Sequence, residues 1–540
     1  MKHPRPVKEA ENRLIRFNAE RVSIVADVER RVVADRVDSA ARAKDTSLEY
    51  VLNDVAYQEI RRLERGLATK EERKGLGAWR DLARRLGRMS DAEKRDRLAR
   101  IVAEYTHDVL GNFNPRVYRF ATSLLPPLLS GLLSPGSIAQ GLSSLGDLSG
   151  KVVIDGPLDH IRACADRGTL VVTPTHSSNM DSVVFGFSLH RAGLPPCTYG
   201  AGKNLFTNPF ISFFMHNLGA YRVDRRLANG LYKDVLKTYS QVLLERGYHS
   251  LFFPGGTRSR SGAIEKKVKL GLLSTALAAY QRHIEKGEVQ RRIYVVPATI
   301  NYAIALEAET LIDDYLAEEG KHRYIIEDDE FSRLGRIVDF SRRMMSMEGS
   351  LVIRYGAPLD VFGNPVDEDG ESIDARGRRV DPAGYVTDAA GKVEPDPQRD
   401  AEYTRALGEE IVSAFRRLTV FMPTNLVARA LFDRLAAQQG TRDIYKLLRE
   451  VEEQVEIGTV RHDLARMVQA LARRPDLGQV GDRWSQARPG EIIDDALRMF
   501  RGYHSRPVVE REGERLVAHD LRLLYYYQNR TAHIAPEVFA

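Results

Sequence analysis

Cysteine and long apolar runs are both scarce in this sequence. Only Cys164 and Cys197 occur among 540 residues, so we expect no disulfide framework and a reducing compartment. No stretch approaches the roughly 18 uninterrupted apolar residues of a membrane-spanning helix. The first residues also lack the apolar core of a signal peptide. If the protein meets a membrane, we expect it to be peripheral, on the cytoplasmic face, without a transmembrane span.

A strong excess of one charge is lacking as well. The chain has 80 basic and 74 acidic residues, a net charge of +6 and a pI near 9.0. This excess is too small to indicate a nucleic-acid partner, but it favours contact with an anionic membrane surface. Apolar residues make up 43% and charged residues 29%, which is typical of a folded protein. The length allows about three domains.

Several catalytic signatures are missing or incomplete. The sequence has no G-x-S-x-G nucleophile elbow and no Cys/His cluster that would indicate zinc. The stretch "CTYGAGKN" imitates a phosphate-binding P-loop, but Cys197 replaces its first glycine and Asn204 its last hydroxyl residue. We therefore expect neither a metal nor a nucleotide cofactor.

The composition and the apolar periodicity of the sequence change four times along the chain, which predicts five regions. They are a helical N-terminal region (1–110), an apolar and possibly membrane-interfacial segment (111–150), an α/β domain (151–362), a polar flexible insert (363–400) and a helical C-terminal region (401–540). The apolar segment is interrupted by Pro126 and Pro127, and ordinary core packing would explain it equally well. No internal repeat is expected.

The α/β domain is predicted by alternating runs. Short β-rich stretches, among them "TLVVTPT", "HSLFFPG" and "RIYVVPATI", are separated by longer helical patterns. This alternation predicts a mostly parallel sheet flanked by helices. In such sheets the ligand-binding groups gather at the carboxyl ends of the strands.

The stretch "THSSNMD" follows one of these strands and places His176 close to Asp181. On one regular helix the two side chains would diverge by about 140°. They can meet only if His176 lies in a loop and Asp181 in the first turn of the next helix, with Ser178 or Asn179 as N-cap. A carboxylate on one imidazole nitrogen leaves the other free to accept a proton. This pair is therefore a candidate general base.

The stretch "FFPGGTRSRSG" indicates an anion-binding loop. After two glycines the backbone N–H groups can converge on an anion. If the segment is extended, Arg258 and Arg260 point to the same side. Two guanidiniums and such a nest of amides suit a phosphate. The alternative is a solvated basic turn.

The order of four blocks adds to this interpretation. "THSSNMDSVV", "GAGKNLFTNPFISFFMHNLGAYRVDRR", "LLERGYHSLFFPGGTRSRSG" and "YVVPATINYA" follow one another between Thr175 and Tyr302. This succession resembles the glycerol-3-phosphate acyltransferase family, within the lysophospholipid acyltransferase superfamily. Weaker similarity continues in "FMPTNLVARALF" and "LLYYYQNRTAH", so that it covers about two thirds of the chain.

The resemblance implies roles for particular residues. His176 would be the base and Asp181 its partner, and Pro297 would shape the wall of the site. The residues implied to bind substrate are Lys203, Arg225, Gly256, Thr257, Arg258 and Arg260. The sequence departs from the family pattern twice. Gly255 replaces the usual glutamate of the third block, and Arg222 replaces an aromatic residue of the second.

The resemblance also implies an activity. An acyl group would pass from acyl-CoA or acyl-carrier protein to the sn-1 hydroxyl of glycerol 3-phosphate, in phospholipid biosynthesis and without a cofactor. The alternative acceptors are a lysophosphatidic acid and dihydroxyacetone phosphate, and a further alternative is a non-catalytic membrane scaffold. The apolar stretch 205–221 would line an acyl groove, dip into the membrane or pack in the core.

Overall fold

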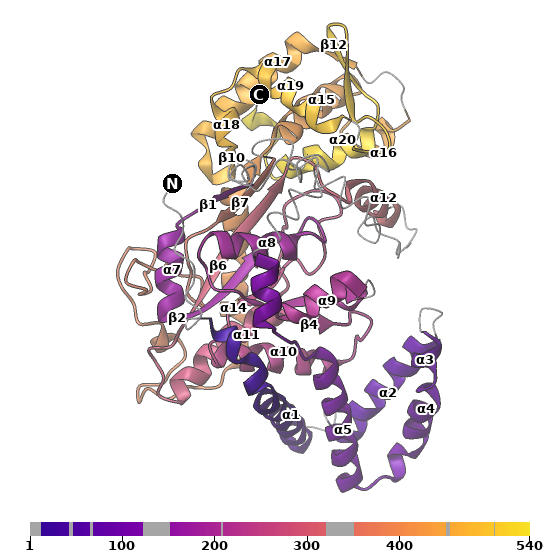
Figure 1. The fold of residues 1–540 in the computed structure, drawn as a ribbon, viewed down its shortest axis with the longest axis vertical. Helices are drawn as coiled ribbons and strands as arrows, with labels where there is room; N and C mark the ends of the chain where they lie inside the picture. Colours follow the sequence, from indigo (N-terminus) through magenta and orange to yellow (C-terminus); the bar gives the residue numbers. More distant parts are fainter. Residues whose placement is uncertain are drawn as a thin grey trace.

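The computed structural model describes residues 12–42, 47–64, 69–122, 152–206, 209–319, 350–449, 454–501 and 503–539. The chain forms three adjoining parts, with the N-terminal helices and the C-terminal region at opposite ends of an α/β layer (Figure 1). Most of the apolar segment predicted at 111–150, namely 123–150, lies outside the described residues. Among the helices that are described, none is both long and apolar enough to cross a membrane.

The N-terminal region is helical, as predicted. Its helices are α1 (Phe17–Arg42), α2 (Leu48–Glu64), α3 (Lys70–Arg73), α4 (Leu76–Arg85) and α5 (Asp91–Val109). A capping box of Ser90 and Glu93 starts α5. The apolar faces of α1, α2 and α5 share one core with α10 (Gly230–Glu245) of the α/β layer. Arg31 of α1 also pairs with the buried Glu245 at 2.6 Å, so the N-terminal helices are part of the same packed body.

The central sheet has the strand order β1-β7-β6-β2-β5-β3-β4. Its strands are β1 (Val152–Asp155), β2 (Gly168–Pro174), β3 (Thr198–Gly202), β4 (Ala220–Val223), β5 (Ser250–Leu251), β6 (Arg292–Tyr302) and β7 (Leu351–Tyr355). The five strands from β6 to β4 run parallel, and β7 runs antiparallel to β6. The predicted fold class is therefore confirmed. The strands β3 and β4 were not predicted.

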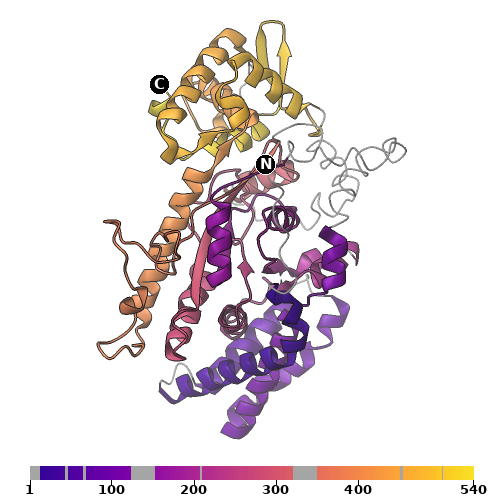
Figure 2. The same cartoon turned by 60° about the vertical axis from the view of Figure 1, so that its left-hand side comes forward.

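Helices cover both faces of the sheet (Figures 1 and 2). Along β2, Leu170 and Val172 pack into one core cluster, which includes α7 (Leu158–Arg167) and α8 (Asp181–Arg191). Val171, which points the other way, packs with α11 (Leu270–Glu285) and α14 (Pro397–Leu418). The alternation of strand side chains thus buries β2 on both faces, which explains its uninterrupted apolar run.

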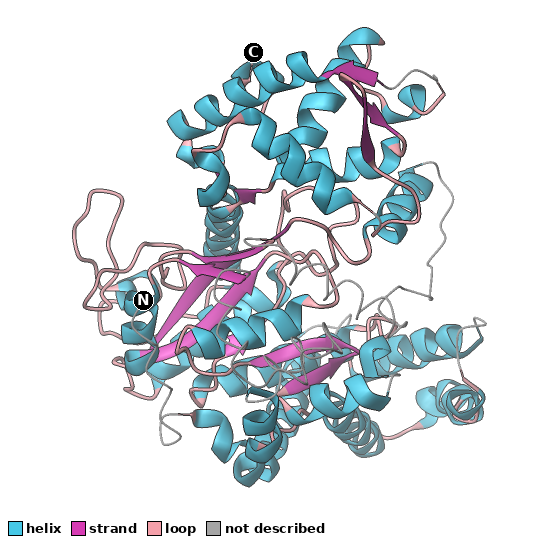
Figure 3. Ribbon diagram, turned by 45° about the horizontal axis from the view of Figure 1, so that its top comes forward, coloured by secondary structure: helices cyan, strands magenta, loops and turns pink. Residues whose placement is uncertain are grey.

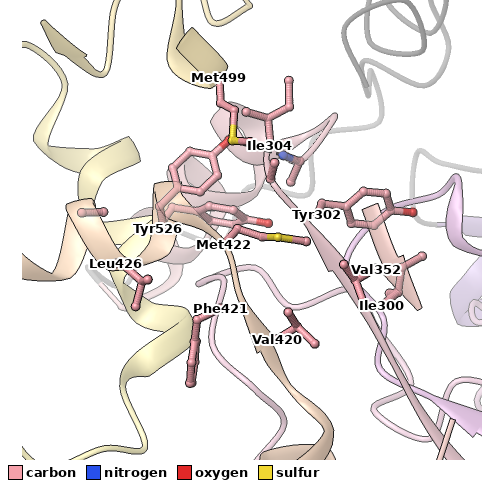
Figure 4. Close-up of a cluster of buried hydrophobic side chains, with 14 of the residues drawn as sticks. Ile300, Tyr302, Ile304, Val352, Val420, Phe421, Met422, Leu426, Met499 and Tyr526 are labelled. Carbon is pink, nitrogen blue, oxygen red and sulfur yellow. Dashed lines mark hydrogen bonds between the residues drawn. The ribbon is translucent and has the colours of Figure 1, made fainter. Parts of the chain in front are cut away.

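The C-terminal region packs on the end of the sheet. It comprises the helices α15 (Pro423–Gln438), α16 (Ile444–Leu447), α17 (Ile457–Arg473), α18 (Asp482–Ser485), α19 (Pro489–Phe500) and α20 (Leu521–Gln528). Ile300 and Tyr302 of β6 belong to the same apolar cluster as Leu426 of α15, Met499 of α19 and Tyr526 of α20 (Figure 4). The two parts therefore share a continuous core.

Two small sheets interrupt the helices of this region (Figure 3). One pairs β8 (Val420–Phe421) with β10 (Gln479–Val480), and the other has the order β11-β12-β9. The strands of the second sheet are β9 (Gln454–Glu456), β11 (Val509–Glu512) and β12 (Arg515–Ala518). The prediction of a helical region omitted both sheets.

The polar insert contains a seven-residue repeat, which corrects the prediction of an irregular segment without repeats. Aspartate recurs at 360, 367, 374, 381 and 388, and a glycine follows each of them three positions later. In Asp367, for example, Oδ1 accepts hydrogen bonds from the N–H groups of Asp369 and Glu371. The same contacts recur two and four residues beyond positions 360, 374 and 388. The insert is thus a series of aspartate-closed turns, and α14 begins before its predicted end.

Candidate functional site

The predicted site residues follow the carboxyl ends of the parallel strands. His176 comes after β2, Lys203 after β3 and Arg225 after β4. The arginine-containing loop follows β5, and Tyr302 ends β6. Because these five strands are parallel neighbours, their carboxyl ends form one edge of the sheet. Segments more than 120 residues apart in sequence therefore meet at this edge.

His176 and Asp181 are in contact, with His176 in the loop and Asp181 at the first position of α8. Nδ1 of His176 lies 2.8 Å from Oδ2 of Asp181. The same Oδ2 accepts hydrogen bonds from the backbone N–H groups of Ser177 at 2.6 Å and Ser178 at 2.9 Å. The N-cap of α8 is Met180, so the N-cap predicted at Ser178 or Asn179 is wrong. The carboxylate itself closes the turn and orients the ring.

Tyr302 holds the other oxygen of this carboxylate. Its hydroxyl donates to Oδ1 of Asp181 at 2.7 Å, and Asp181 is fully buried. Burial, together with the charge of Asp181, raises the pKa of Tyr302 well above its usual value, so the phenol remains a donor. Asp181 therefore receives four hydrogen bonds, and Nε2 of His176 is left as the nitrogen that can accept a proton.

The surroundings of His176 favour its neutral form. Its ring stacks on Phe253 with the centroids 4.1 Å apart, and its side chain is 12% exposed. Burial lowers the pKa of His176, the contact with Asp181 opposes this effect, and the positive charges of Arg258 and Arg225 lower the pKa further. A neutral imidazole at physiological pH is the form that a general base requires.

The charges of Arg258 and Arg225 act on His176, and the charge of Arg258 acts on Arg225. Desolvation and the charge of Arg258 both lower the pKa of Arg225. Nη1 of Arg258 lies 3.4 Å from Oε1 of Glu307, which is fully buried. Two positive charges that act on one histidine are a candidate site for an anion.

Arg260 stands two positions after Arg258 in the same loop. No strand is assigned to residues 252–262, and Gly256 adopts a left-handed φ of +76° in the turn before the two arginines. Arg260 pairs with Glu318 of α12 (Ala308–Glu319) at 2.6 Å. The expectation that Arg258 and Arg260 point to the same side depended on an extended segment, and it stays a prediction.

Lys203 contacts carboxylates at the end of β4. Its Nζ lies 3.3 Å from Oδ1 of Asp108 on α5 and 3.5 Å from Oδ2 of Asp224. Asp224 also pairs with Arg226, at 2.8 Å. Lys203 thus connects α5 of the N-terminal helices to the residue that precedes Arg225.

Gly256 and Thr257 form the tip of the arginine-containing loop. The N–H of Gly256 donates to the carbonyl of Phe253 at 3.0 Å, and Thr257 is exposed. The left-handed φ of Gly256 favours glycine there, and a Cβ atom would also displace the end of the flexible Lys269 side chain, 2.5 Å away.

Glu265, Glu307 and Arg530 were not predicted to belong to this site. Oε1 of Glu265 accepts a hydrogen bond from the backbone N–H of His176 at 3.0 Å. Arg530 follows α20 and donates to the carbonyl of Ile300 at 3.0 Å. Its charge acts on Glu265 and Asp181. The sequence indicated Arg530 only through the weak family similarity of the stretch "LLYYYQNRTAH". It gave no indication of Glu265 or Glu307.

Two further expectations have mixed outcomes. Arg222 lies over the ring of Phe206, 5.2 Å from its centroid, which gives this unusual arginine a cation–π partner. In the apolar stretch 205–221, α9 (Pro209–Asn217) buries Met215 and leaves Phe213 about half exposed. This stretch therefore packs in part and faces solvent in part.

A pocket lies between the His176 loop and the C-terminal region. Its lining includes Ser177, Gly262, Tyr302, Tyr526 and Arg530. Throughout the described part of the chain, no three His, Cys, Asp or Glu side chains converge as metal ligands do. The site thus combines a histidine–carboxylate pair, the positive charges of Arg258 and Arg225 and a contribution from the C-terminal region.

Comparison with known proteins bears on the chemistry of this site. Residues 158–301 match the acyltransferase family model. The chain carries an acyltransferase domain. Three curated relatives, all named glycerol-3-phosphate acyltransferase, align with it. The protein of Haemophilus ducreyi is 34% identical over 154 residues, that of Aeromonas hydrophila 29% over 208 and that of Xanthomonas axonopodis 26% over 203.

These alignments cover 28–38% of this chain and 18–23% of the relatives, so the chain matches about a fifth of their length. A crystal structure of a 1-acyl-sn-glycerophosphate acyltransferase from Thermotoga maritima is 14% identical, with a TM-score of 0.25, over 55% of this chain and 92% of that one. The acyltransferase domain, as matched, begins at α7 and ends within β6. It contains all the predicted site residues.

Proposed function

We propose that the protein transfers a fatty acyl group from an acyl thioester to the sn-1 hydroxyl of glycerol 3-phosphate. The observation that carries this proposal is the contact between His176 and Asp181 inside the acyltransferase domain, where the charges of Arg258 and Arg225 act on the same histidine. The names of the curated relatives support glycerol 3-phosphate as acceptor. The donor would be acyl-CoA or acyl-carrier protein.

The proposed reaction needs only the groups at this edge of the sheet. Nε2 of His176 removes the proton of the acceptor hydroxyl as its oxygen attacks the thioester carbon. The C–S bond then breaks, and the proton passes from the imidazolium to the departing thiolate. Asp181 stabilises the imidazolium, while Arg258 and Arg225 hold the phosphate and orient the hydroxyl. The reaction balances without a metal or redox cofactor.

We also propose that the protein works at an anionic membrane surface. The aromatic rings of Phe120 and Phe213 are both exposed, which supports this proposal. The segment that carries Phe120 is joined to the end of α9, which carries Phe213, by a β-bridge between Phe113 and Leu218. The net positive charge supports it as well. A peripheral site would bring the acyl product directly to the bilayer.

One assay tests acceptor and membrane together. The intact protein is mixed with anionic vesicles, labelled palmitoyl-CoA and one of three acceptors: glycerol 3-phosphate, lysophosphatidic acid or dihydroxyacetone phosphate. We expect labelled product with the first acceptor at a rate at least about tenfold above the others, and protein in the vesicle pellet at low salt. Faster transfer to another acceptor would reassign the substrate. No transfer from palmitoyl-CoA or from palmitoyl-acyl-carrier protein would favour a scaffold.

The pH dependence of kcat is expected to reflect the environment of His176. Because burial and the nearby arginines lower its pKa, the imidazole stays neutral below its ordinary value of about 6.5. Activity should therefore persist at pH 6.5 and decline only at lower pH, as the base becomes protonated. Ionisation of the substrate phosphate can change KM, and measuring kcat at saturating acceptor keeps this effect out of the pH profile.

An Arg258→Gln variant tests whether the nearby positive charge lowers the pKa of His176. Removing that positive charge raises the pKa of His176, so the acidic limb should move to higher pH. Arg260→Gln is the matched control, because Arg260 pairs with Glu318. Unchanged limbs in both variants would contradict the electrostatic explanation.

A further inference from the structure

Glu265 is hydrogen-bonded to the main chain of His176. Oε1 of its carboxylate accepts the His176 N–H at 3.0 Å. On the other side of the same residue, the His176 carbonyl accepts the N–H of Ser259 at 2.8 Å. Both contacts come from the loop between β5 and α11. The histidine backbone is thus held at its donor and its acceptor by one segment.

The carboxylate of Glu265 also fills the space beside Gly255. A Cβ atom at Gly255 would lie 3.0 Å from Cγ and 3.2 Å from Oε1 of Glu265. The backbone of Gly255 is not in the left-handed region, so its conformation would accept a side chain. A side chain at 255 would therefore be crowded by the side chain of Glu265.

Glu265 is half-buried, and its carboxyl group has a specific electrostatic setting. Burial raises its pKa, the hydrogen bond from His176 and the charge of Arg530 lower it, and the charge of Asp181 raises it. Within the described residues, its second oxygen, Oε2, is buried without a hydrogen-bond partner. A carboxyl oxygen withdrawn from water destabilises the fold unless it is hydrogen-bonded or paired, so the Glu265 side chain carries a cost at this position.

We propose that Glu265 is a positioning residue that supplies the site with the carboxylate that position 255 lacks. Its carboxyl group fixes the His176 main chain and so keeps the ring on Asp181 and Phe253. The space beside Gly255 accommodates one carboxylate, which can belong to a side chain at position 265 or at position 255. This inference rests on the proposed acyl transfer, because its consequence for rate is defined by that reaction.

Exchange of the two positions tests the proposal. The variants are Glu265→Ala, Gly255→Glu and the double variant, all in the intact chain. We expect Glu265→Ala to lower kcat about 30-fold with the acceptor KM within about threefold of wild type, since the base is displaced and the pocket is not. Gly255→Glu should lower kcat about tenfold through crowding. The double variant should recover kcat to within about threefold of wild type.

Two more variants separate positioning from charge and from unspecific effects. Glu265→Gln keeps an oxygen that can accept the His176 N–H, so kcat should stay within about fivefold of wild type. Glu285→Ala removes an exposed carboxylate at the end of α11 and should change nothing. A double variant no more active than the worse single one would overturn the proposal. So would wild-type kcat in Glu265→Ala, or a Gln variant as slow as the Ala variant.

Thermal unfolding of the same proteins gives a reading that does not depend on activity. Each single change should lower Tm, and the double variant should recover most of the loss, which makes the pair non-additive. If the wild type transfers no acyl group, the proposed function fails, yet a recovered Tm still supports the exchange of the carboxylate. Additive losses in Tm would reject the exchange even if the wild type is active.

Discussion

We expect His176→Ala to lower kcat/KM for acyl transfer about 10³-fold, with little change in Tm. General-base catalysis contributes roughly 10² to 10⁴, and in this site one nitrogen of His176 is held by Asp181 while the other can take the proton. The ring lies in a loop rather than in the core of the sheet. Steady-state rates with saturating acyl-CoA, together with thermal unfolding, provide the measurement.

His190→Ala is the matched control for this experiment. His190 lies in the last turn of α8, the helix that Asp181 begins, and burial together with Arg191 lowers its pKa as well. It has no part in the proposed reaction, so its loss should leave the rate within about twofold of wild type. Wild-type activity in His176→Ala would refute the assignment of the base, whatever the control shows.

The second large effect is expected from Arg258→Gln, which should raise KM for glycerol 3-phosphate about 100-fold. Hydrogen bonds to a charged group contribute roughly 1.5–3 kcal/mol each, and a guanidinium can give a phosphate two of them. KM for the acyl donor should change less than about threefold, because the donor is bound elsewhere. Initial rates with each substrate varied in turn separate the two constants.

Arg260→Gln is again the informative comparison, since the two arginines stand two positions apart in one loop. The structure pairs Arg260 with Glu318 of α12 and places Arg258 where its charge acts on His176. We expect the Arg260 variant to raise the acceptor KM less than about fivefold. An equal or larger effect at 260 than at 258 would show that the anion lies on the α12 side of the loop.

The sequence predicted those parts of the fold whose signals are local. The runs at β2 and β6 are apolar on both faces and were readily recognised as strands of a buried parallel sheet. The strands β3 and β4 were missed because "TYGAG" contains two glycines and "AYRV" has only four residues. Both are strands because of their pairing with each other and with β5, which is a non-local effect.

The site was predictable to a similar degree. The contact between His176 and Asp181 depends on one short loop, so a break between loop and helix was enough to anticipate it. The positions of Arg258 and Arg260 depend on whether their segment is a strand or a turn, and the assumption of a strand failed. Glu265 and Arg530 reach the site through tertiary packing, and no spacing in the sequence places them there.

The repeat in the polar insert shows a different kind of omission. Its aspartates recur every seven residues, whereas searches for helical or strand periodicity follow the apolar residues. Because four of the five aspartates bind backbone N–H groups two and four residues ahead, and Asp381 binds the one two residues ahead, the turns are stabilised locally. A search for repeats of short length would have identified them.

The contacts across β6 mean that the family-matched stretch cannot be excised as a working unit. A fragment ending at residue 301 would lose β7, the antiparallel neighbour of β6, and the Arg530 side chain that binds the Ile300 carbonyl. The loop bearing Arg258 would also lose Asn529, which donates to the Ser261 carbonyl at 2.9 Å. Truncations meant to isolate the chemistry must therefore retain the last helix of the chain.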